Sequence, residues 1–450
     1  MLKQGDVIRF KAENYADAET VGVVQDTAVF VPRLIVGEEA TVKINYVKKN
    51  AAYGDVVQIT KPSAKRRKPP CPRFGECGGC ALLHMAYSEQ LVFKRDKVCR
   101  NLRKIGKLDA EVLPCVPSAL ILGYRNKLSL PVSGKRGNAV IGMYRRNSHE
   151  VISCERCLLG GEWAATLAKI FKDYLDSEEI APYNEKDFSG EVRHLVARYI
   201  DGQLLAVVVS NGEFKRDLSP FARSLERHFD KFGLFVNVND NKNNVIMGKF
   251  TTHICGLQYI ESEHLGVKFR LRPNSFFQVN NGVKDAIYLK VKELLDLSQT
   301  EALIDCFSGI GVLTNVLADG KFQTYAIEIE PSAISDAKEL AELNGKKIFN
   351  ICGDVNKELP KLVEKLTNKK LTLTVDPPRK GLGDTVCQTI LQANIDNIVY
   401  ISCDSATLAR DLSMLSSAYD AVYVEPYDMF PQTDQVETVV LLARKKNSYA

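Results

Sequence analysis

The chain has 450 residues, of which 45% are hydrophobic and 26% are charged, values typical of a globular protein with room for about two to four domains. A net charge of +5 is too mild for the whole surface to attract nucleic acid, so any such contact must be a local basic patch. The apolar runs are too short to span a bilayer and the N-terminus lacks a signal-peptide core, which predicts a cytoplasmic protein without a membrane partner.

Residues 1–60 alternate short β-rich runs with turns. The runs lie at residues 6–10, 20–24, 28–31, 40–44 and 55–59. Five short strands in so small a unit predict a closed barrel of the OB type. The basic stretch 43–49 favours RNA as its ligand, and a structural β-domain without a ligand is the alternative. A linker with five positive charges and prolines near both ends follows at residues 61–70, where phosphate contact would also be possible.

Five of the twelve cysteines are closely spaced, and a chain without a secretion signal is not expected to use them in disulfides. A zinc ribbon would pair Cys77 and Cys80 with Cys154 and Cys157, and would leave Cys71 unused. An iron–sulfur cluster would use Cys71, Cys77, Cys80 and one of the later two cysteines. The 73 residues between the two CxxC pairs are far longer than a usual ribbon loop, so the spacing favours the cluster.

Residues 88–105 carry the pattern of an amphipathic helix. Its expected apolar face consists of Leu91, Val98, Leu102 and Ile105, and basic side chains on other faces are Lys94, Lys97, Arg100 and Lys104. The simplest interpretation is a surface helix whose lysines reach into solvent. From about residue 110 to 265, predicted strands (127–132, 191–199, 204–209 and 233–238) mix with helices (161–176 and 221–228), which indicates a central α/β domain.

A glycine turn marks the C-terminal half. Residues 303–311 (LIDCFSGIG) predict a buried strand, a tight turn and the start of a helix, and a second strand ends at Glu328, where a carboxylate can bind ribose hydroxyls. Thr314 stands where a dinucleotide fingerprint has its third glycine. Asp305 would repel a pyrophosphate and attract an amino group. These features favour S-adenosylmethionine over NAD, and an NAD-dependent oxidoreductase remains the alternative.

Later strands deliver further polar residues to the same edge of an alternating β/α sheet, where ligands gather. The strand 371–375 ends at Asp376, and the strand 398–401 is followed by Cys403. A thiol at this edge can act as a nucleophile, although a cysteine at a strand end is usually a packing residue. Glu437, just before the last strand, is the candidate base. Gln278, ahead of the predicted helix 282–297, can bind a cofactor or begin the helix.

Several stretches together resemble the RNA (uracil-5-)-methyltransferase family. They are Phe276 to Asn280, Asp305 to Gly311, Asp376 to Arg379, Ser402 to Asp404, and Met429 to Pro431 with Val436 and Glu437. The resemblance covers essentially the whole chain. It implies a multidomain α/β protein with an OB-like TRAM barrel (1–60), a linker, iron–sulfur segment and central α/β domain (61–265), and a Rossmann-like class I methyltransferase domain (266–450). The family's [4Fe-4S] pattern matches Cys71, Cys77, Cys80 and Cys157, which favours Cys157 over Cys154.

The resemblance implies methylation of uridine C5 in single-stranded or loop RNA. Cys403 would add to C6 of the uracil and Glu437 would remove the C5 proton. The cofactor-binding residues implied for S-adenosylmethionine are Gln278, Phe307, Glu328 and Asp376. Gln435 departs from the family, which commonly has histidine at this position.

The TRAM barrel and the cluster together resemble the bacterial 23S ribosomal RNA enzymes more than the shorter tRNA U54 enzymes. The implied partner is therefore 23S rRNA, with no obligate protein partner. A tRNA-directed enzyme and a non-catalytic RNA-binding or ribosome-assembly protein are the alternatives.

Overall fold

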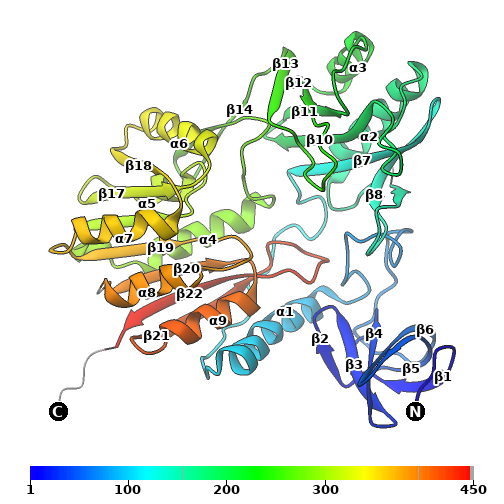
Figure 1. The fold of residues 1–450 in the computed structure, drawn as a ribbon, viewed down its shortest axis with the longest axis horizontal. Helices are drawn as coiled ribbons and strands as arrows, with labels where there is room; N and C mark the ends of the chain where they lie inside the picture. The colour runs from blue at the N-terminus through cyan, green and yellow to red at the C-terminus, as the bar shows by residue number, and fades with distance from the viewer. Residues whose placement is uncertain (155, 394, 446–450) are drawn as a thin grey trace.

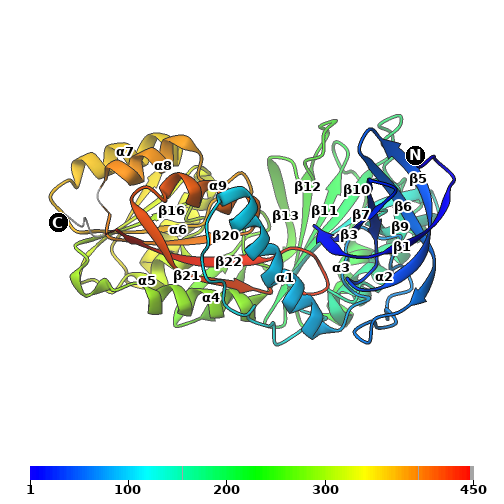
Figure 2. The same cartoon turned by 90° about the horizontal axis from the view of Figure 1, so that it is seen from below.

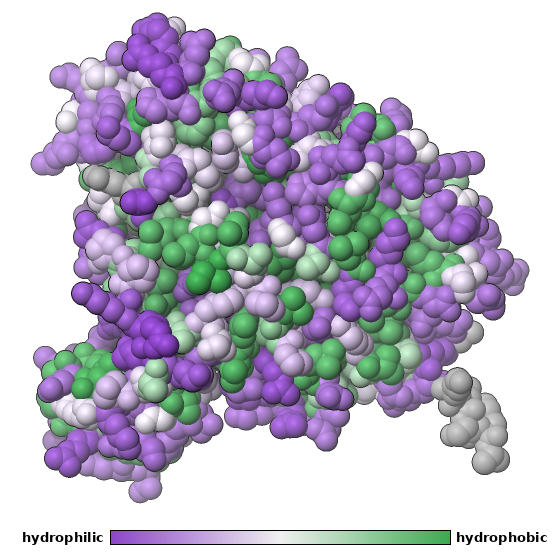
Figure 3. Space-filling model, turned by 180° about the vertical axis from the view of Figure 1, so that it is seen from behind, coloured by the Kyte–Doolittle hydropathy of each residue, from purple (hydrophilic) through white to green (hydrophobic). Residues whose placement is uncertain are grey.

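The computed structural model describes residues 1–154, 156–393 and 395–445. Its strands form an N-terminal, a central and a C-terminal sheet, together with one hairpin (Figure 1). The C-terminal sheet occupies one end of the elongated molecule, and the other two sheets share the opposite end (Figure 2). On the face seen in Figure 3, hydrophilic residues dominate the periphery and apolar residues gather in patches across the middle. Every helix among the described residues is too short or too polar to span a lipid bilayer.

Six strands, one more than predicted, form the N-terminal sheet in the order β1-β5-β6-β4-β3-β2. They are β1 (Val7–Lys11), β2 (Asn14–Ala16), β3 (Glu19–Val24), β4 (Thr27–Pro32), β5 (Glu39–Lys48) and β6 (Ala51–Lys61). The sheet curls until β3 meets the end of β1. The Glu13 N–H donates to the Val21 carbonyl (3.0 Å), and a Cβ on Gly22 would lie 2.3 Å from the Lys11 carbonyl oxygen. Alternate residues of β4 and β5 point into a small apolar core inside the curl.

The central sheet has the order β13-β12-β11-β10-β7-β8-β9. Its elements are β7 (Lys127–Lys135), β8 (Asn138–Tyr144), β9 (Val151–Ser153), α2 (Gly161–Ser177), β10 (Val192–Ile200), β11 (Gln203–Ser210), α3 (Ser219–His228), β12 (Lys231–Val238) and β13 (Phe250–Gly256). Leu195 of β10 packs with α2 and α3 on one face, whereas its neighbour Val196 packs on the other face with the hairpin of β14 (Ile260–His264) and β15 (Val267–Leu271). That second face also contacts Ile310 and Val312, so the central sheet borders the C-terminal half directly.

The C-terminal sheet has the order β18-β17-β16-β19-β20-β22-β21, in which all neighbouring strands pair in parallel except at β22. Its strands are β16 (Ala302–Cys306), β17 (Gln323–Glu328), β18 (Ile348–Cys352), β19 (Leu371–Val375), β20 (Asn397–Ser402), β21 (Tyr419–Tyr427) and β22 (Glu437–Arg444). The accompanying helices are α4 (Asn281–Leu294), a 3-10 turn (Leu297–Gln299), α5 (Val312–Leu317), α6 (Pro331–Leu343), α7 (Val355–Lys365), α8 (Asp384–Gln392) and α9 (Ser405–Leu415).

Helices cover both faces of this sheet. Leu303 packs with α4 and α5, and its neighbour Ile304 packs with α7, α8 and α9. Because both faces are buried, the central strands are continuous apolar runs rather than alternating ones. The parallel strands therefore end together at one protected edge.

Helix α1 (Tyr87–Asn101) continues through a π-helical turn (Leu102–Gly106), close to the predicted helix 88–105. The predicted faces were partly wrong, because Lys94 is fully buried and Ile105 is 45% exposed. The Lys94 ammonium pairs with the buried carboxylate of Asp428 and donates to the Phe430 carbonyl (3.0 Å). Burying a lysine requires such a partner, and this one lies 334 residues further along the chain.

Candidate active site

A cavity of about 630 Å³ opens at the carboxyl ends of the parallel strands. Phe307, Asp376 and Cys403 directly follow β16, β19 and β20, and Glu328 ends β17. All six residues predicted for cofactor binding and catalysis line this cavity: Gln278, Phe307, Glu328, Asp376, Cys403 and Glu437. The strand ends thus bring together residues that lie as much as 159 positions apart in the sequence.

The turn after β16 is held in an unusual backbone conformation. Phe307 has φ +63°, which is uncommon for a residue with a side chain, and Gly309 and Gly311 also have positive φ. The Glu328 carboxylate supports this turn, because Oε2 accepts from the Gly309 N–H (3.0 Å) and Oε1 accepts from the Glu330 N–H (2.9 Å). The second strand therefore fixes both the turn and the position of its own acidic side chain.

Asp305 serves the fold from beneath the turn. It is buried, and its two carboxylate oxygens accept from the hydroxyls of Thr314 and of Thr374 (2.7 Å for the latter). Thr314, the residue that replaces the third glycine of a dinucleotide fingerprint, is thus needed to satisfy this buried acid. The sequence predicted that Asp305 meets a ligand amino group. In the structure Asp305 is not among the described residues that line the cavity, and its carboxylate binds within the fold instead.

Strand register explains why the candidate nucleophile and base lie together. Ser402 of β20 is paired with Thr438 of the antiparallel strand β22. Cys403 follows Ser402 and Glu437 precedes Thr438, so antiparallel pairing brings these two residues to the same end of neighbouring strands. Glu437 is 2% exposed, and its Oε2 has no hydrogen-bond partner among the described residues. A buried carboxylate that lines a cavity and has an oxygen without a hydrogen-bond partner is suited to accept a proton from a bound molecule.

The acidic groups around Cys403 are crowded and poorly solvated. Burial, and then repulsion from Asp376, raises the pKa of Glu437 to about 8. Burial also raises the pKa of Asp376 to about 7, with repulsion from Asp305 as the smaller cause. The pKa of the Cys403 thiol rises to about 12 through burial and the charges of Glu437 and Asp376, which Arg379 only partly offsets. A cationic ligand in the cavity would lower all three pKa values.

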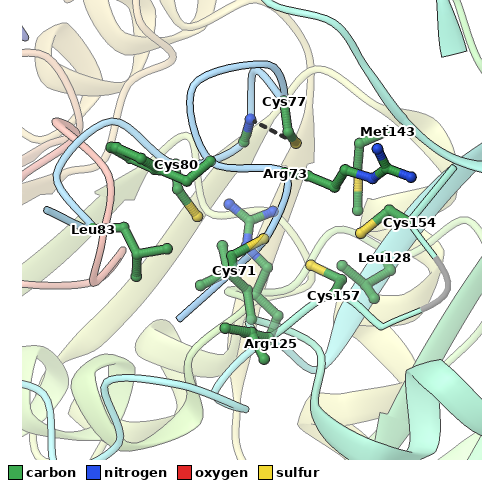
Figure 4. Close-up of a pocket in the computed structure, with 14 residues that line it drawn as sticks. Cys71, Arg73, Cys77, Cys80, Leu83, Arg125, Leu128, Met143, Cys154 and Cys157 are labelled. Atoms are coloured by element: carbon green, nitrogen blue, oxygen red, sulfur yellow. Dashed lines mark hydrogen bonds between the residues drawn. The ribbon is translucent and has the colours of Figure 1, made fainter. Parts of the chain in front are cut away.

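The predicted metal ligands surround a second, smaller cavity of about 80 Å³ (Figure 4). Cys71, Cys77, Cys80, Cys154 and Cys157 all line it, together with the guanidinium of Arg125 and several apolar side chains. The Gly79 N–H donates to Cys77 Sγ (3.3 Å). Within the described residues no group of three or more His, Cys, Asp or Glu side chains has the arrangement of a metal site. The thiols share one cavity without converging on one point.

Several residues around the first cavity had no role assigned from the sequence. Phe276 lines the cavity yet is 71% exposed, and Phe430, from the loop between β21 and β22, also lines it. Lys94 supports that loop from helix α1, and Gln432 lies buried within it. The exposed aromatic Phe276 had a signal in the sequence, since it lies two residues before Gln278, but the burial of Lys94 and Gln432 depends on contacts that are distant in the chain.

Comparison with known proteins gives consistent matches over almost the whole chain. The family described as tRNA (Uracil-5-)-methyltransferase matches residues 87–445. An RNA methyltransferase of Clostridium tetani is 35% identical over 94% of this chain and 93% of its own length, and one of Listeria innocua is 33% identical over 99% of both chains. The crystal structure of Pyrococcus abyssi tRNA (uracil-54, C5)-methyltransferase in complex with S-adenosyl-L-homocysteine superposes with a TM-score of 0.77 at 26% identity, covering 97% of this chain and 100% of that one.

Proposed function

Because the chain belongs to the tRNA (uracil-5-)-methyltransferase family, we propose that it methylates uridine C5 in RNA by covalent catalysis, with Cys403 as the nucleophile and Glu437 as the base. The observation that carries this proposal is the register of β20 and β22. It places a thiol beside a buried carboxylate whose Oε2 has no hydrogen-bond partner in the described part of the chain, at the wall of a cavity large enough for a nucleoside.

The lining of the cavity supports S-adenosylmethionine as the methyl donor. Among the described residues, six acidic side chains line it (Glu328, Glu330, Asp336, Asp354, Asp376 and Glu437), against two basic side chains, Arg379 and Lys380. This balance disfavours the pyrophosphate of NAD and suits a ligand that carries a sulfonium and an ammonium group. Glu328, at the tip of the second strand, is placed to bind ribose hydroxyls, and Gln278, Phe307 and Asp376 complete the proposed cofactor-binding set.

Uracil C5 is a poor nucleophile, and the proposed reaction activates it. S-adenosylmethionine, when bound, supplies an electrophilic methyl group. Cys403 Sγ adds to C6 of the uracil as a thiolate, which gives C5 the electron density to accept the methyl group. The bond between the methyl carbon and the sulfonium sulfur breaks in this transfer, and S-adenosylhomocysteine is the leaving group. Glu437 then takes the proton from C5, the C5–C6 double bond re-forms, and Cys403 is expelled. The target base must leave its stack to reach Cys403, so loop or single-stranded RNA is the substrate.

We further propose that the cysteine cavity holds a [4Fe-4S] cluster on Cys71, Cys77, Cys80 and Cys157. All five cysteines line this cavity, and the family resemblance selects these four, with Cys71 in place of the Cys154 that a zinc ribbon would use. The Arg125 guanidinium and the Gly79 N–H that donates to Cys77 Sγ suit the negative charge of thiolate ligands. The cavity lies apart from Cys403 and Glu437, so the cluster would order this segment and take no part in methyl transfer.

We propose the domain division that the sequence suggested: a TRAM barrel at 1–60, an iron–sulfur and central domain at 61–265, and a methyltransferase domain at 266–450. We propose 23S rRNA as the substrate, from the resemblance of the barrel and cysteine pattern to bacterial ribosomal enzymes. From the sequence, tRNA-directed enzymes were expected to be shorter than this chain. The match to the archaeal tRNA enzyme covers 97% of this chain, so chain length does not distinguish ribosomal RNA from tRNA as the substrate. That neighbour makes tRNA the second candidate substrate.

Tritium release distinguishes these candidates. RNA labelled with tritium at uracil C5 is incubated with the protein and S-adenosylmethionine, with ribosomal and transfer RNA supplied separately. Release from ribosomal RNA that is lost in Cys403→Ala is the expected result. Release from tRNA alone would show that tRNA, and not ribosomal RNA, is the substrate. Release from neither RNA would refute the proposed function.

A further inference from the structure

The loop between β21 and β22 forms the part of the cavity wall that leads to the proposed base, Glu437. It leaves the sheet at Tyr427 and returns at Glu437, two residues that are paired directly across the strands. Phe430, Gln435 and Glu437 contribute to the cavity lining. The position of the Glu437 carboxylate therefore depends on how the preceding residues of this loop, residues 428–436, are held.

Gln432 is the most constrained residue of this loop. It is 4% exposed and has φ +71°, a left-handed conformation that is unfavourable for a residue with a side chain. A backbone of this kind persists only where surrounding contacts impose it. The contacts of Gln432 therefore identify the residues that keep the loop in this conformation.

Every polar group of Gln432 has a partner from a distant part of the chain. Its carbonyl oxygen accepts from the N–H groups of Ala81 and Leu82, at 3.0 Å each. Its N–H donates to Gln90 Oε1 (3.1 Å), and its Oε1 accepts from Gln90 Nε2 (2.9 Å), so the two glutamines form a reciprocal pair. Its Nε2 donates to the Ile121 carbonyl (3.2 Å). Such a buried and fully satisfied network fixes one geometry.

Ala81 and Leu82 belong to the cysteine segment (residues 71–85), Gln90 belongs to helix α1, and Ile121 lies in the connection between α1 and β7. Ala81 and Leu82 directly follow Cys80, which lines the cysteine cavity. Gln90 is buried in α1, and its Nε2 also donates to the Met85 carbonyl (3.1 Å) at the end of the same segment. A second link runs through Tyr124, whose hydroxyl donates to the Pro431 carbonyl (3.1 Å) beside Gln432. The cysteine segment is thus hydrogen-bonded directly to the loop that ends in the proposed base.

We propose that Gln432 is a positioning residue that couples the order of the cysteine segment to the placement of Glu437. This inference rests on the proposed function for its catalytic consequence, whereas the coupling itself is a property of the fold. When the cysteine segment is ordered, Ala81 and Leu82 hold the Gln432 carbonyl, and Gln90 holds its side chain. When the segment is disordered, as on loss of a bound metal centre, the left-handed turn at Gln432 relaxes and Glu437 leaves its position against the uracil C5.

The test measures kinetics and loop mobility in the full-length protein. Gln432→Ala and Gln90→Ala are compared with Gln392→Ala, which removes an exposed amide at the end of α8. Displacing a catalytic group by about 1 Å can cost roughly 100-fold in rate. We expect kcat for tritium release to fall by that order in the first two variants, with KM for RNA and the Kd for S-adenosylmethionine unchanged. The double variant should be no slower than either single variant, because both residues act through one pair.

Hydrogen exchange of residues 428–437 tests the coupling without reference to activity. Removing metal from the wild type with EDTA and ferricyanide should speed exchange in this loop, whereas Gln432→Ala should exchange fast before and after the treatment. In protein that iron analysis shows to contain the cluster before treatment, an unchanged loop after metal removal would overturn the proposal. An unchanged kcat in both Gln432→Ala and Gln90→Ala would overturn it whether or not metal is bound. If Gln432→Ala does not fold, Gln90→Ala and the treated wild type decide the matter. Absence of tritium release from the wild type would count against the proposed function alone.

Discussion

Replacing Glu437 by glutamine tests the electrostatics of the site through the stability of the protein. Burial and repulsion from Asp376 raise the pKa of Glu437 from 4.5 to about 8, so the folded protein holds this proton more tightly than the unfolded chain does. The resulting stability is fully present below pH 4.5 and is lost as the pH rises through 8. Since one pKa unit corresponds to about 1.4 kcal/mol, the full rise corresponds to roughly 5 kcal/mol. A glutamine at this position stays neutral at every pH, so the variant keeps this stability when the pH rises.

Thermal unfolding of the ligand-free protein between pH 5 and pH 9 measures this difference. Glu437 lies in the proposed methyltransferase domain (266–450). For a domain of about 150–250 residues, each kcal/mol of stability shifts Tm by about 2–4 °C. Glu437→Gln should therefore unfold at a temperature on the order of 10 °C above the wild type at pH 9, and close to the wild type at pH 5. Glu342→Gln, which changes an exposed glutamate of α6, serves as the control and should follow the wild type. A Tm difference that is the same at pH 5 and at pH 9 would show that the folded protein does not hold the Glu437 proton more tightly than the unfolded chain.

Three further changes probe other parts of the structure. Cys80→Ser should abolish the brown colour of anaerobically purified protein and Cys154→Ser should retain it; a colourless wild type containing one zinc ion would argue for the ribbon instead. Lys94→Met should lower the free energy of unfolding by about 3–5 kcal/mol, because it leaves the carboxylate of Asp428 buried without its cation, and an unchanged Tm would contradict that role. Glu328→Gln should weaken S-adenosylmethionine binding by roughly 10-fold or more in calorimetry through loss of charge-assisted hydrogen bonds, and unaltered affinity would remove this residue from the cofactor site.

The C-terminal sheet could be predicted because its signals are local. The apolar runs that became β16, β19 and β20 are continuous, as expected of strands covered on both faces, and each is followed at once by a polar residue or a glycine turn that lines the cavity. Parallel strands of similar length end at one edge, so Phe307, Asp376 and Cys403 could be grouped from the sequence alone. The proximity of Glu437 to Cys403 was harder to predict from the sequence, because it depends on the last strand entering the sheet between β20 and β21.

The features that escaped prediction depend on contacts across long sequence separations. Lys94 has the helical spacing of a surface lysine, and only its partner Asp428, 334 residues away, makes burial possible. The strand β2 is three residues long and has no apolar alternation, so its pairing with β3 left no pattern to detect. Gln432 is polar and lies in a loop, and its burial follows from Gln90 and the cysteine segment rather than from its neighbours in sequence.

The most direct test of covalent catalysis is to trap the adduct between protein and RNA. Glu437→Gln retains Cys403 and lacks the base that removes the C5 proton, so it should accumulate with S-adenosylmethionine and substrate RNA as a complex that survives denaturing electrophoresis. Mass spectrometry should place the methylated uridine on Cys403, and Glu437→Gln combined with Cys403→Ala should give no complex. A complex that persists without Cys403, or turnover by Cys403→Ala, would contradict the account.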